Sequence, residues 1–373
     1  MKIKSIKLIK FNPRLTKPFV YFMAKLNFLP YVLVEIKVDN GLVGYGEAAL
    51  AWDVTGETQD GALGILKYIK PLVLDQEFNS LKELEQITSK INTYIYGNNA
   101  LKAAIEMSLL DILGKEKKMP VFEILGGKNK DFVLAQKVFT FNYTFKEIQK
   151  NIKESLANGT KIIKLKVGQD FKKEITTISH ICKMFPDVKL VFDVNQGWIN
   201  TEIALRNIKQ LEKYSNNISW IEQPILYYDY DGLAEIRKNT KIKIMADESC
   251  KNLFDLENLY YRQAIDLVNI KLAKTGGMIE MIKMIKFCEK NKIGYMLGDM
   301  ISSSLGTAAN LQAATLGNFV SYDITLPGSL KKDPFIGLEF DNCKAFIPKN
   351  TGLGVELSFD KNSRDKIFGR VEE

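Results

Sequence analysis

Hydrophobic and polar positions follow a strand-like spacing in the first 50 residues and then change to a helical one. Two short apolar stretches, Val32–Val38 and Leu42–Tyr45, flank a DNG turn, a combination typical of a β-hairpin. From about residue 58 to 118 the pattern is helical, most clearly in Asn99–Lys118, where apolar residues recur every three or four positions and Glu and Lys occupy the opposite face. We therefore expect strands first, then helices ending before Pro120.

Short β-rich runs alternate with amphipathic helical stretches from about residue 134 onward. Such alternation is typical of parallel strands joined by helices. Eight runs within roughly 200 residues fit a closed β/α barrel better than an open doubly wound sheet. The runs are Ala135–Phe141, Ile162–Val167, Lys189–Val194, Ser219–Ile221, Ile242–Ala246, Leu267–Lys271, Ile293–Leu297 and Phe319–Asp323.

Length and composition favour a globular protein of about two domains. The chain has 373 residues, of which 46% are apolar and 26% are charged. No apolar run is long enough to span a bilayer, and Met1–Phe11, which alternates Lys with Ile and Leu, indicates a strand rather than a secretory signal. Four scattered cysteines without a C-x-x-C pair favour a reducing, cytoplasmic setting.

Charge and histidine content narrow the possible functions further. The net charge is +8, but the lysines are spread along the chain, so we expect a solvated surface and neither nucleic acid nor a membrane as partner. The single histidine, His180, lies in a helix-like stretch and is expected at the surface. Acid–base chemistry should therefore depend on Lys, Asp or Glu rather than on a histidine-containing triad.

Charged residues recur where the predicted barrel strands end, which is where barrel enzymes carry their catalytic groups. The steps between successive groups are 29, 29, 25 and 24 residues, about one βα unit each, so the groups should face one barrel mouth. Lys166 stands two residues after the first of them and shares its strand face. The recurring groups are Lys164, Asp193, Glu222, Asp247 and Lys271.

Three carboxylates in one barrel mouth would repel each other unless a cation neutralised them. Oxygen ligands suit a hard ion, and Mg²⁺ is the usual choice where a substrate oxygen completes the coordination shell. Lysines beside such a site can act as bases if their pKa is lowered. The alternative for each residue alone is a loop cap or an ordinary ion pair, but five such residues in register favour a catalytic site.

These motifs resemble the muconate-lactonising subgroup of the enolase superfamily, and within it the dipeptide epimerases. The resemblance extends over nearly the whole chain. It is carried by KLKVG (164–168), DVNQGW (193–198), IEQP (221–224), ADES (246–249) and NIKLAKTGG (269–277), with GYGEA (44–48), TGET (55–58) and AAIEMSLLDILGK (103–115) in the N-terminal region.

The resemblance implies an α/β fold, a (β/α)7β modified TIM barrel at residues 126–329 with an α+β capping domain at 1–125, onto which residues 330–373 pack back. It implies that Asp193, Glu222 and Asp247 bind Mg²⁺. It also implies that Lys166 and Lys271 exchange a proton with opposite faces of the carbon next to a carboxylate, through an ene-diolate, and that Lys164 assists Lys166 and contacts the substrate carboxylate.

Three segments resemble dipeptide epimerases most closely: LTKPF (15–19), GDMISSSLG (298–306) and VSYDITLP (320–327). In that family the last segment carries a D-x-D pair that holds the dipeptide ammonium group. Here the pair reads Asp323 and Thr325, and Asp299 is a candidate for the missing charge. Asn195 is expected at the substrate as well.

Family members specific for Ala-Glu dipeptides tend to place an arginine in the capping loop, where it binds the glutamate carboxylate. This chain has Ala24 there, followed by Lys25, which either serves a similar role or points to solvent. The first expectation is therefore an L-Ala-D/L-Glu epimerase, or one for another L-Ala-L-Xaa dipeptide, that forms a homo-oligomer. An apolar or otherwise charged second residue is an alternative, as are o-succinylbenzoate synthase, N-acylamino acid racemase and muconate cycloisomerase activities. A non-catalytic binding protein would require a broken set of core residues, and all five are present.

Overall fold

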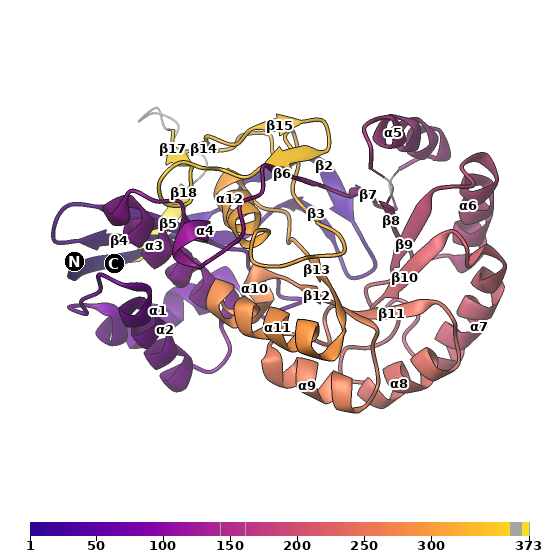
Figure 1. Cartoon of the computed structure of the whole chain (residues 1–373), viewed down its shortest axis with the longest axis horizontal. Helices are drawn as coiled ribbons and strands as arrows, with labels where there is room; N and C mark the ends of the chain where they lie inside the picture. The colour runs from indigo at the N-terminus through magenta and orange to yellow at the C-terminus, as the bar shows by residue number, and fades with distance from the viewer. Residues whose placement is uncertain (142, 161, 359–367, 373) are drawn as a thin grey trace.

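The computed structural model describes residues 1–141, 143–160, 162–358 and 368–372 (Figure 1). Both chain ends lie at the side of the molecule formed by an antiparallel sheet, and the barrel strands with their helices lie at the other side. The fold is α/β, with an N-terminal capping domain followed by a curled parallel sheet that alternates with helices.

The cap is built on a four-stranded antiparallel sheet in the order β18-β1-β4-β5. Its strands are β1 (Ile3–Phe11), β4 (Tyr31–Val38), β5 (Val43–Ala48) and β18 (Phe368–Glu372). β4 and β5 form the predicted hairpin, with Lys37 opposite Val43. A separate hairpin of β2 (Arg14–Val20) and β3 (Lys25–Phe28) forms the capping loop.

Three helices cover the cap sheet: α1 (Gln59–Val73), α2 (Leu81–Tyr94) and α3 (Asn99–Lys117). Thr58 and Ser80 cap α1 and α2 through their hydroxyl groups. β5 lies so close to α3 that a Cβ on Gly46 would overlap the carbonyl of Ala104, which explains the glycine in the GYGEA motif.

The predicted helix is confirmed as α3, but most of its charged residues are buried together with its apolar ones. All residues from Ala100 to Gly114 are buried, including the charged ones. Lys102 donates to the carbonyl of Ile95, and Glu106 accepts hydrogen bonds from a barrel helix. These charged side chains of α3 are thus satisfied by internal partners.

The barrel sheet has seven parallel strands in sequence order. The eighth predicted strand is reduced to Tyr322, which forms parallel bridges to Ala135 and Leu297 and so joins the two edges of the sheet. The regular strands are β7 (Lys137–Phe139), β8 (Ile162–Lys166), β9 (Lys189–Asp193), β10 (Ile218–Glu222), β11 (Lys243–Ala246), β12 (Leu267–Ile270) and β13 (Gly294–Leu297).

Helices connect the barrel strands and surround the curled sheet in Figure 1. His180 lies exposed on one of them, as predicted. The helices are α5 (Phe145–Ala157), α6 (Phe171–Met184), α7 (Thr201–Leu211), α8 (Tyr230–Lys238), α9 (Leu253–Tyr261), α10 (Leu272–Thr275), α11 (Met278–Asn291) and α12 (Ser304–Ala313), with the short elements η1 (Glu212–Tyr214) and α4 (Val121–Ile124).

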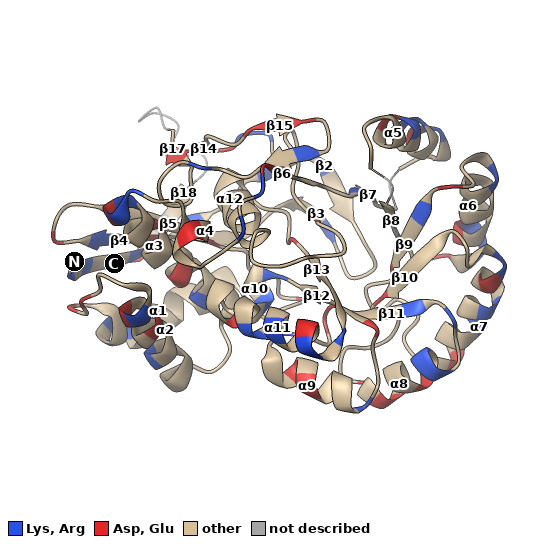
Figure 2. Cartoon of the chain, viewed as in Figure 1, with Lys and Arg blue, Asp and Glu red and all other residues tan. Residues whose placement is uncertain are grey.

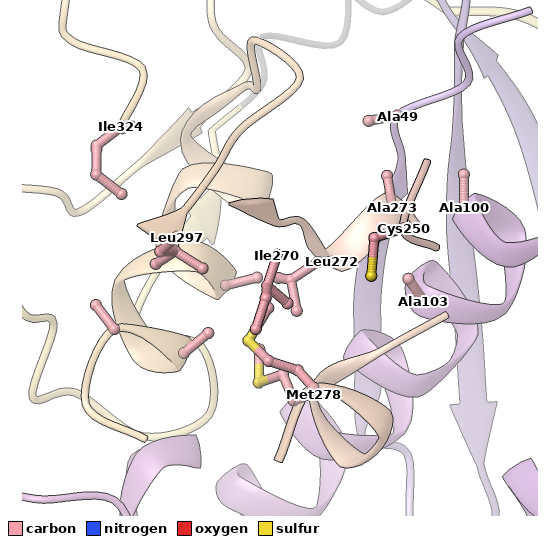
Figure 3. Packing of buried hydrophobic residues seen from close by; sticks show 14 of the residues in the cluster. Ala49, Ala100, Ala103, Cys250, Ile270, Leu272, Ala273, Met278, Leu297 and Ile324 are labelled. Atoms are coloured by element: carbon pink, nitrogen blue, oxygen red, sulfur yellow. The ribbon is translucent and has the colours of Figure 1, made fainter. Parts of the chain in front are cut away.

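Small side chains allow the cap and the barrel to approach closely. Figure 3 shows Ala100 and Ala103 of α3 facing Ala273 of α10, with Cys250 beside them, and all four are buried. The last part of the chain crosses both regions through β14 (Phe335–Ile336), β15 (Phe340–Asp341), β16 (Lys344–Phe346) and β17 (Glu356–Leu357). β16 pairs with β6 (Phe132–Leu134), while β18 pairs with β1.

The surface charge is mixed. In Figure 2, Lys and Arg occur together with Asp and Glu along the outer helices, for example on α7 and α11. In the part of the chain that the structure describes, no helix is both long enough and apolar enough to cross a membrane.

Candidate active site

Acidic side chains at the carboxyl ends of three neighbouring strands form the centre of the site. The parallel register places Lys166 opposite Asp193, and Asp193 opposite Glu222. Asp247 directly follows β11, the next strand in the sheet. The spacing of one βα unit per charged group thus brings these residues to one end of the barrel, and the three carboxylates are almost completely buried.

The two lysines of β8 point into the barrel and contact these acids. Lys164 is buried, and its Nζ lies 2.9 Å from Glu222 Oε2, 3.4 Å from Asp193 Oδ2 and 3.3 Å from Asp323 Oδ2. Lys166 Nζ lies 2.6 Å from Asp193 Oδ2 and donates to Asn195 Oδ1 at 2.7 Å. β8 therefore supplies two ammonium groups at two depths of the barrel.

Lysines on the other side of the acids hold Asp247. Lys271 follows β12, and its Nζ lies 2.6 Å from Asp247 Oδ2. Lys274, on α10, donates to Asp247 Oδ1 at 2.6 Å and to the carbonyl of Asn269 at 2.7 Å. In the sheet order, β9, β10 and β11 separate β8 from β12, so Lys166 and Lys271 approach the acids from opposite sides.

Burial and mutual repulsion perturb these carboxyl groups. Burial, followed by repulsion from Asp193, raises the pKa of Glu222 to about 7. For Asp193, burial opposes ionisation, but the Lys166 and Lys164 charges outweigh it and hold the pKa below its usual value. Burial likewise opposes the ionisation of Asp247, whose pKa is kept below its usual value by Lys271 and Lys274.

The donor set fits a hard divalent cation. In the described ranges, no three acidic, thiol or imidazole groups are arranged to hold a metal ion. Lysine ammonium groups form ion pairs with the acids instead. Yet Asp193 Oδ1 and Glu248 Oε2 are buried without a hydrogen-bond partner, and Glu222 Oε2 has only the ion pair with Lys164. Unsatisfied buried carboxylate oxygens are the ligands that Mg²⁺ prefers.

A pocket of about 400 Å³ lies between these groups and the capping loop. Lys166, Asp193 and Lys271 line its barrel side. The capping hairpin covers it, and Lys166 Nζ lies 5.5 Å from the ring centroid of Tyr21 and 5.7 Å from that of Phe19. The lysine that contacts Asp193 is thus covered by aromatic rings of the cap.

Asp323, Thr325 and Asp299 all line this pocket, but they have different partners. Asp323 contacts Lys164, as described above. Asp299 Oδ1 accepts from the amide of Met300, the hydroxyl of Ser302 and the amide side chain of Asn310, and Oδ2 accepts from the amide and hydroxyl of Thr325. Internal donors therefore satisfy Asp299, and it organises the loop after β13.

The remaining predicted substrate residues are not equally close to the site. Asn195 is buried, lines the pocket and has a positive φ of 45°, a strained backbone conformation of the kind found at functional turns. Ala24 and Lys25 lie at the tip of the capping hairpin, where Tyr21 donates its amide to the carbonyl of Ala24. Neither is among the described residues that line the pocket, and Lys25 is exposed.

Three buried residues at the site had no role in the sequence interpretation. Glu248 accepts from Asn195 at 3.1 Å, Asn269 donates to Glu222 at 2.8 Å, and Lys274 holds Asp247. Each stands inside a quoted motif, one to three residues from a predicted ligand or lysine. Closeness in sequence to a predicted site residue could have indicated these three residues. It does not show which neighbouring side chains point into the barrel.

Comparisons with known proteins find relatives that match both regions of the chain. The family model described as mandelate racemase / muconate lactonizing enzyme, N-terminal domain, matches residues 4–126, and the one described as enolase C-terminal domain-like matches 147–361. The chain is 31% identical to N-succinyl-L-Arg/Lys racemase of Bacillus cereus, with 99% of both chains covered. It is 33% identical to L-amino acid-D/L-Glu epimerase of Francisella philomiragia, over 95% of this chain and 99% of that one.

Solved structures are similar over the whole chain. The Bacillus cereus racemase has a TM-score of 0.91 at 29% identity, covering 100% of this chain and 99% of that one. A dipeptide epimerase from Cytophaga hutchinsonii, complexed with Mg and D-Ala-L-Val, has a TM-score of 0.89 at 28% identity, with 100% of both chains covered. Members of the superfamily thus include Mg-bound enzymes. The chain belongs to the enolase superfamily, in its mandelate racemase and muconate lactonizing enzyme group, and is an isomerase that racemises or epimerises amino acid derivatives.

Proposed function

We propose that this enzyme is a Mg²⁺-dependent dipeptide epimerase that inverts the α-carbon of the C-terminal residue of an L-Ala-L-Xaa or related dipeptide. The observation that carries the proposal is the position of Lys166 and Lys271 on either side of three buried carboxylates beneath the pocket lined by the capping hairpin. The D-Ala-L-Val bound to the Cytophaga relative supports a dipeptide as the substrate class.

Asp193, Glu222 and Asp247 would hold the metal ion. Asp193 Oδ1, which has no hydrogen-bond partner, and Glu222 Oε2, which is paired only with Lys164, are available to it. When bound, Mg²⁺ supplies positive charge that stabilises the substrate carboxylate and lowers the pKa of the neighbouring lysines. Lys164, which reaches both acids and Asp323, would orient the same carboxylate from below.

Proton transfer falls to the lysines on the two sides. One neutral amine takes the α-proton from its face of the carbon, while the ammonium on the opposite face returns a proton. Because the two residues belong to different strands across the acids, removal and return occur on opposite faces, and the centre is inverted. The aromatic rings over Lys166 exclude water, which limits loss of the proton to solvent.

An N-acylamino acid racemase is the second candidate, and one observation favours it. The dipeptide epimerase pattern uses two acids for the ammonium group, whereas here Thr325 takes the second position and internal donors satisfy Asp299. Asp323 alone would have to bind the ammonium while contacting Lys164. An acyl group carries no such charge. Asp323→Ala separates the candidates: it should abolish turnover of a dipeptide and spare an N-succinyl amino acid.

The α-proton itself provides the main test of the proposal. In D₂O with Mg²⁺, wild type should replace the α-proton of both epimers of its substrate with deuterium, followed by NMR. Lys166→Ala and Lys271→Ala should each exchange one epimer only and lose inversion by about 100-fold or more, since general base catalysis contributes that much. Exposed Lys172→Ala on α6 is the control and should match wild type.

The exchange experiment should use a panel of L-Ala-L-Xaa dipeptides and N-succinyl amino acids. A negative result then cannot be caused by testing one wrong substrate. Absence of exchange with every member would refute the proposed function. Equal loss of exchange from both epimers in each single-lysine variant would refute the assignment of one lysine to each face.

A further inference from the structure

The pocket that covers the site has an uneven charge distribution on its cap side. Two charged residues of the cap line it, Lys17 and Asp53. The Lys17 side chain is 64% exposed, and its ammonium lies 3.5 Å from Glu147 Oε1, so it is at the rim and already neutralised. Asp53 is half-buried and follows the exposed Trp52.

Contacts through one aromatic ring relate Asp53 to the reacting groups. The Tyr21 hydroxyl donates to Asp53 Oδ2. The Lys166 ammonium lies 5.5 Å from the centroid of the same tyrosine ring. Tyr21 is 8% exposed, so its ring is fixed by packing. Tyr21 therefore contacts both groups and holds the carboxylate of Asp53 on the cap side of Lys166.

The pocket that Asp53 lines has mostly apolar walls. A carboxylate against apolar walls attracts an opposite charge more strongly than one in water, and it excludes a like charge. Cap and loop residues that form these walls are Phe19, Leu26, Leu29, Leu50, Val54 and Ile301.

We propose that Asp53 binds the side chain of the residue being inverted, and that this side chain is cationic, as in lysine or arginine. The inference rests on the proposed function, since it needs the α-carbon to lie between Lys166 and Lys271. A chain of four or five bonds from that carbon past the Tyr21 ring ends in an ammonium or guanidinium group against Asp53, with apolar stem atoms along the walls.

The same arrangement disfavours the L-Ala-D/L-Glu substrate expected from the sequence. A glutamate side chain would bring a second carboxylate toward Asp53, and Lys25, expected to pair with it, is exposed and outside the pocket lining. Lys137 lines the pocket too. Its neighbour Val138 is paired with Lys164 and points into the barrel, so the side chain of Lys137 leaves the strand on the opposite, outer face.

Steady-state kinetics with L-Ala-L-Lys, L-Ala-L-Leu and L-Ala-L-Glu, and with the matching N-succinyl amino acids, test this inference. Wild type should prefer the lysine substrates. Asp53→Asn should lower kcat/KM for them about 30-fold or more, mainly through KM, and change the leucine substrates little. Asp53→Arg should shift the preference toward glutamate substrates.

Tyr21→Phe keeps the ring over Lys166 and removes only the hydroxyl that holds Asp53. It should raise KM for lysine substrates severalfold more than KM for leucine substrates. Glu77→Gln removes an exposed acid from the cap outside the pocket and is the charge-matched control. Circular dichroism checks that each variant is folded.

The outcomes separate this inference from the proposed function. Exchange with leucine or glutamate substrates that equals exchange with lysine substrates, unchanged by Asp53→Asn, would overturn the cationic subsite and leave the epimerase intact. No exchange with any substrate would instead overturn the proposed function on which the inference rests.

Discussion

At the scale of single residues, Asp247 depends on two lysines with different surroundings. Lys271 Nζ contacts one carboxylate oxygen and lines the substrate pocket. Lys274 Nζ is fully buried and donates to the other oxygen and to the carbonyl groups of Asp247 and Asn269, so its three protons are all used. Lys271 can therefore leave its carboxylate to act on substrate, while Lys274 keeps Asp247 in place.

Lys274→Met should destabilise the protein, because it removes the charge and the ammonium that donates to the Asp247 carboxylate and to the Asn269 carbonyl. We expect the free energy of unfolding to fall by about 2–4 kcal/mol. Urea unfolding measures it. Lys183→Met, at an exposed site of α6, should change it by less than about 0.5 kcal/mol. Equal values for the two variants would contradict this role.

At the scale of elements, cap carboxylates complete the N-termini of barrel helices. Glu106 of α3 accepts from the amides of Met278 and Ile279, where α11 begins without a side-chain cap of its own. Glu47 of β5 accepts from the amide and hydroxyl of Ser303 at the start of α12. Both contacts join the cap to the helices that flank the loop after β13.

These contacts make stability depend on pH. Burial raises the pKa of Glu106 to about 8 and that of Glu47 to about 8, from ordinary values of 4.5. Since the folded pKa of each acid is raised, the unfolded chain loses its proton first, and stability falls as pH rises from about 4.5 to about 8. Below pH 4.5 this loss is absent.

Glu106→Gln should remove part of this dependence. The difference in free energy of unfolding between wild type and variant should decrease by roughly 3 kcal/mol from pH 5 to pH 8. Urea titrations at several pH values measure it, with Glu123→Gln, at an exposed position of α4, as the control. A difference that stays constant or grows with pH would show that Glu106 is ionised in the folded protein.

At the scale of the whole molecule, the end of the chain returns to its beginning. β18 pairs antiparallel with β1, and the ring of Phe368 stacks on Phe11 with centroids 5.5 Å apart. Without β18, β1 would become the edge of the cap sheet, and its unpaired amides and carbonyls would be open to other chains.

Ending the chain after Ser358 should lower the melting temperature by about 3–8 °C and increase aggregation. Calorimetry and light scattering measure these effects. Phe368→Leu in the full chain keeps the strand pairing and loses only the stacked rings, so its decrease should be smaller. An unchanged melting temperature on truncation would show that β18 contributes little to the cap.

The sequence predicted the strand ends well because their pattern is local and repeated. A period of one βα unit places successive charged residues at one end of a parallel sheet, and the register of Lys166, Asp193 and Glu222 follows from it. The helix α3 was predicted correctly, but its full burial was not, for the opposite reason. Periodicity separates polar from apolar faces, but the barrel covers the polar face as well.

By itself, the sequence determined the order of strands and helices, the barrel, and the acids and lysines at its mouth, because each depends on spacing along the chain. Only the tertiary structure decided what lies around them: Lys274 against Asp247, Asp299 satisfied within its loop, and Asp53 held by Tyr21 beside the pocket. Those contacts join residues from separate segments, and their chemistry depends on burial and distance, which spacing alone does not contain.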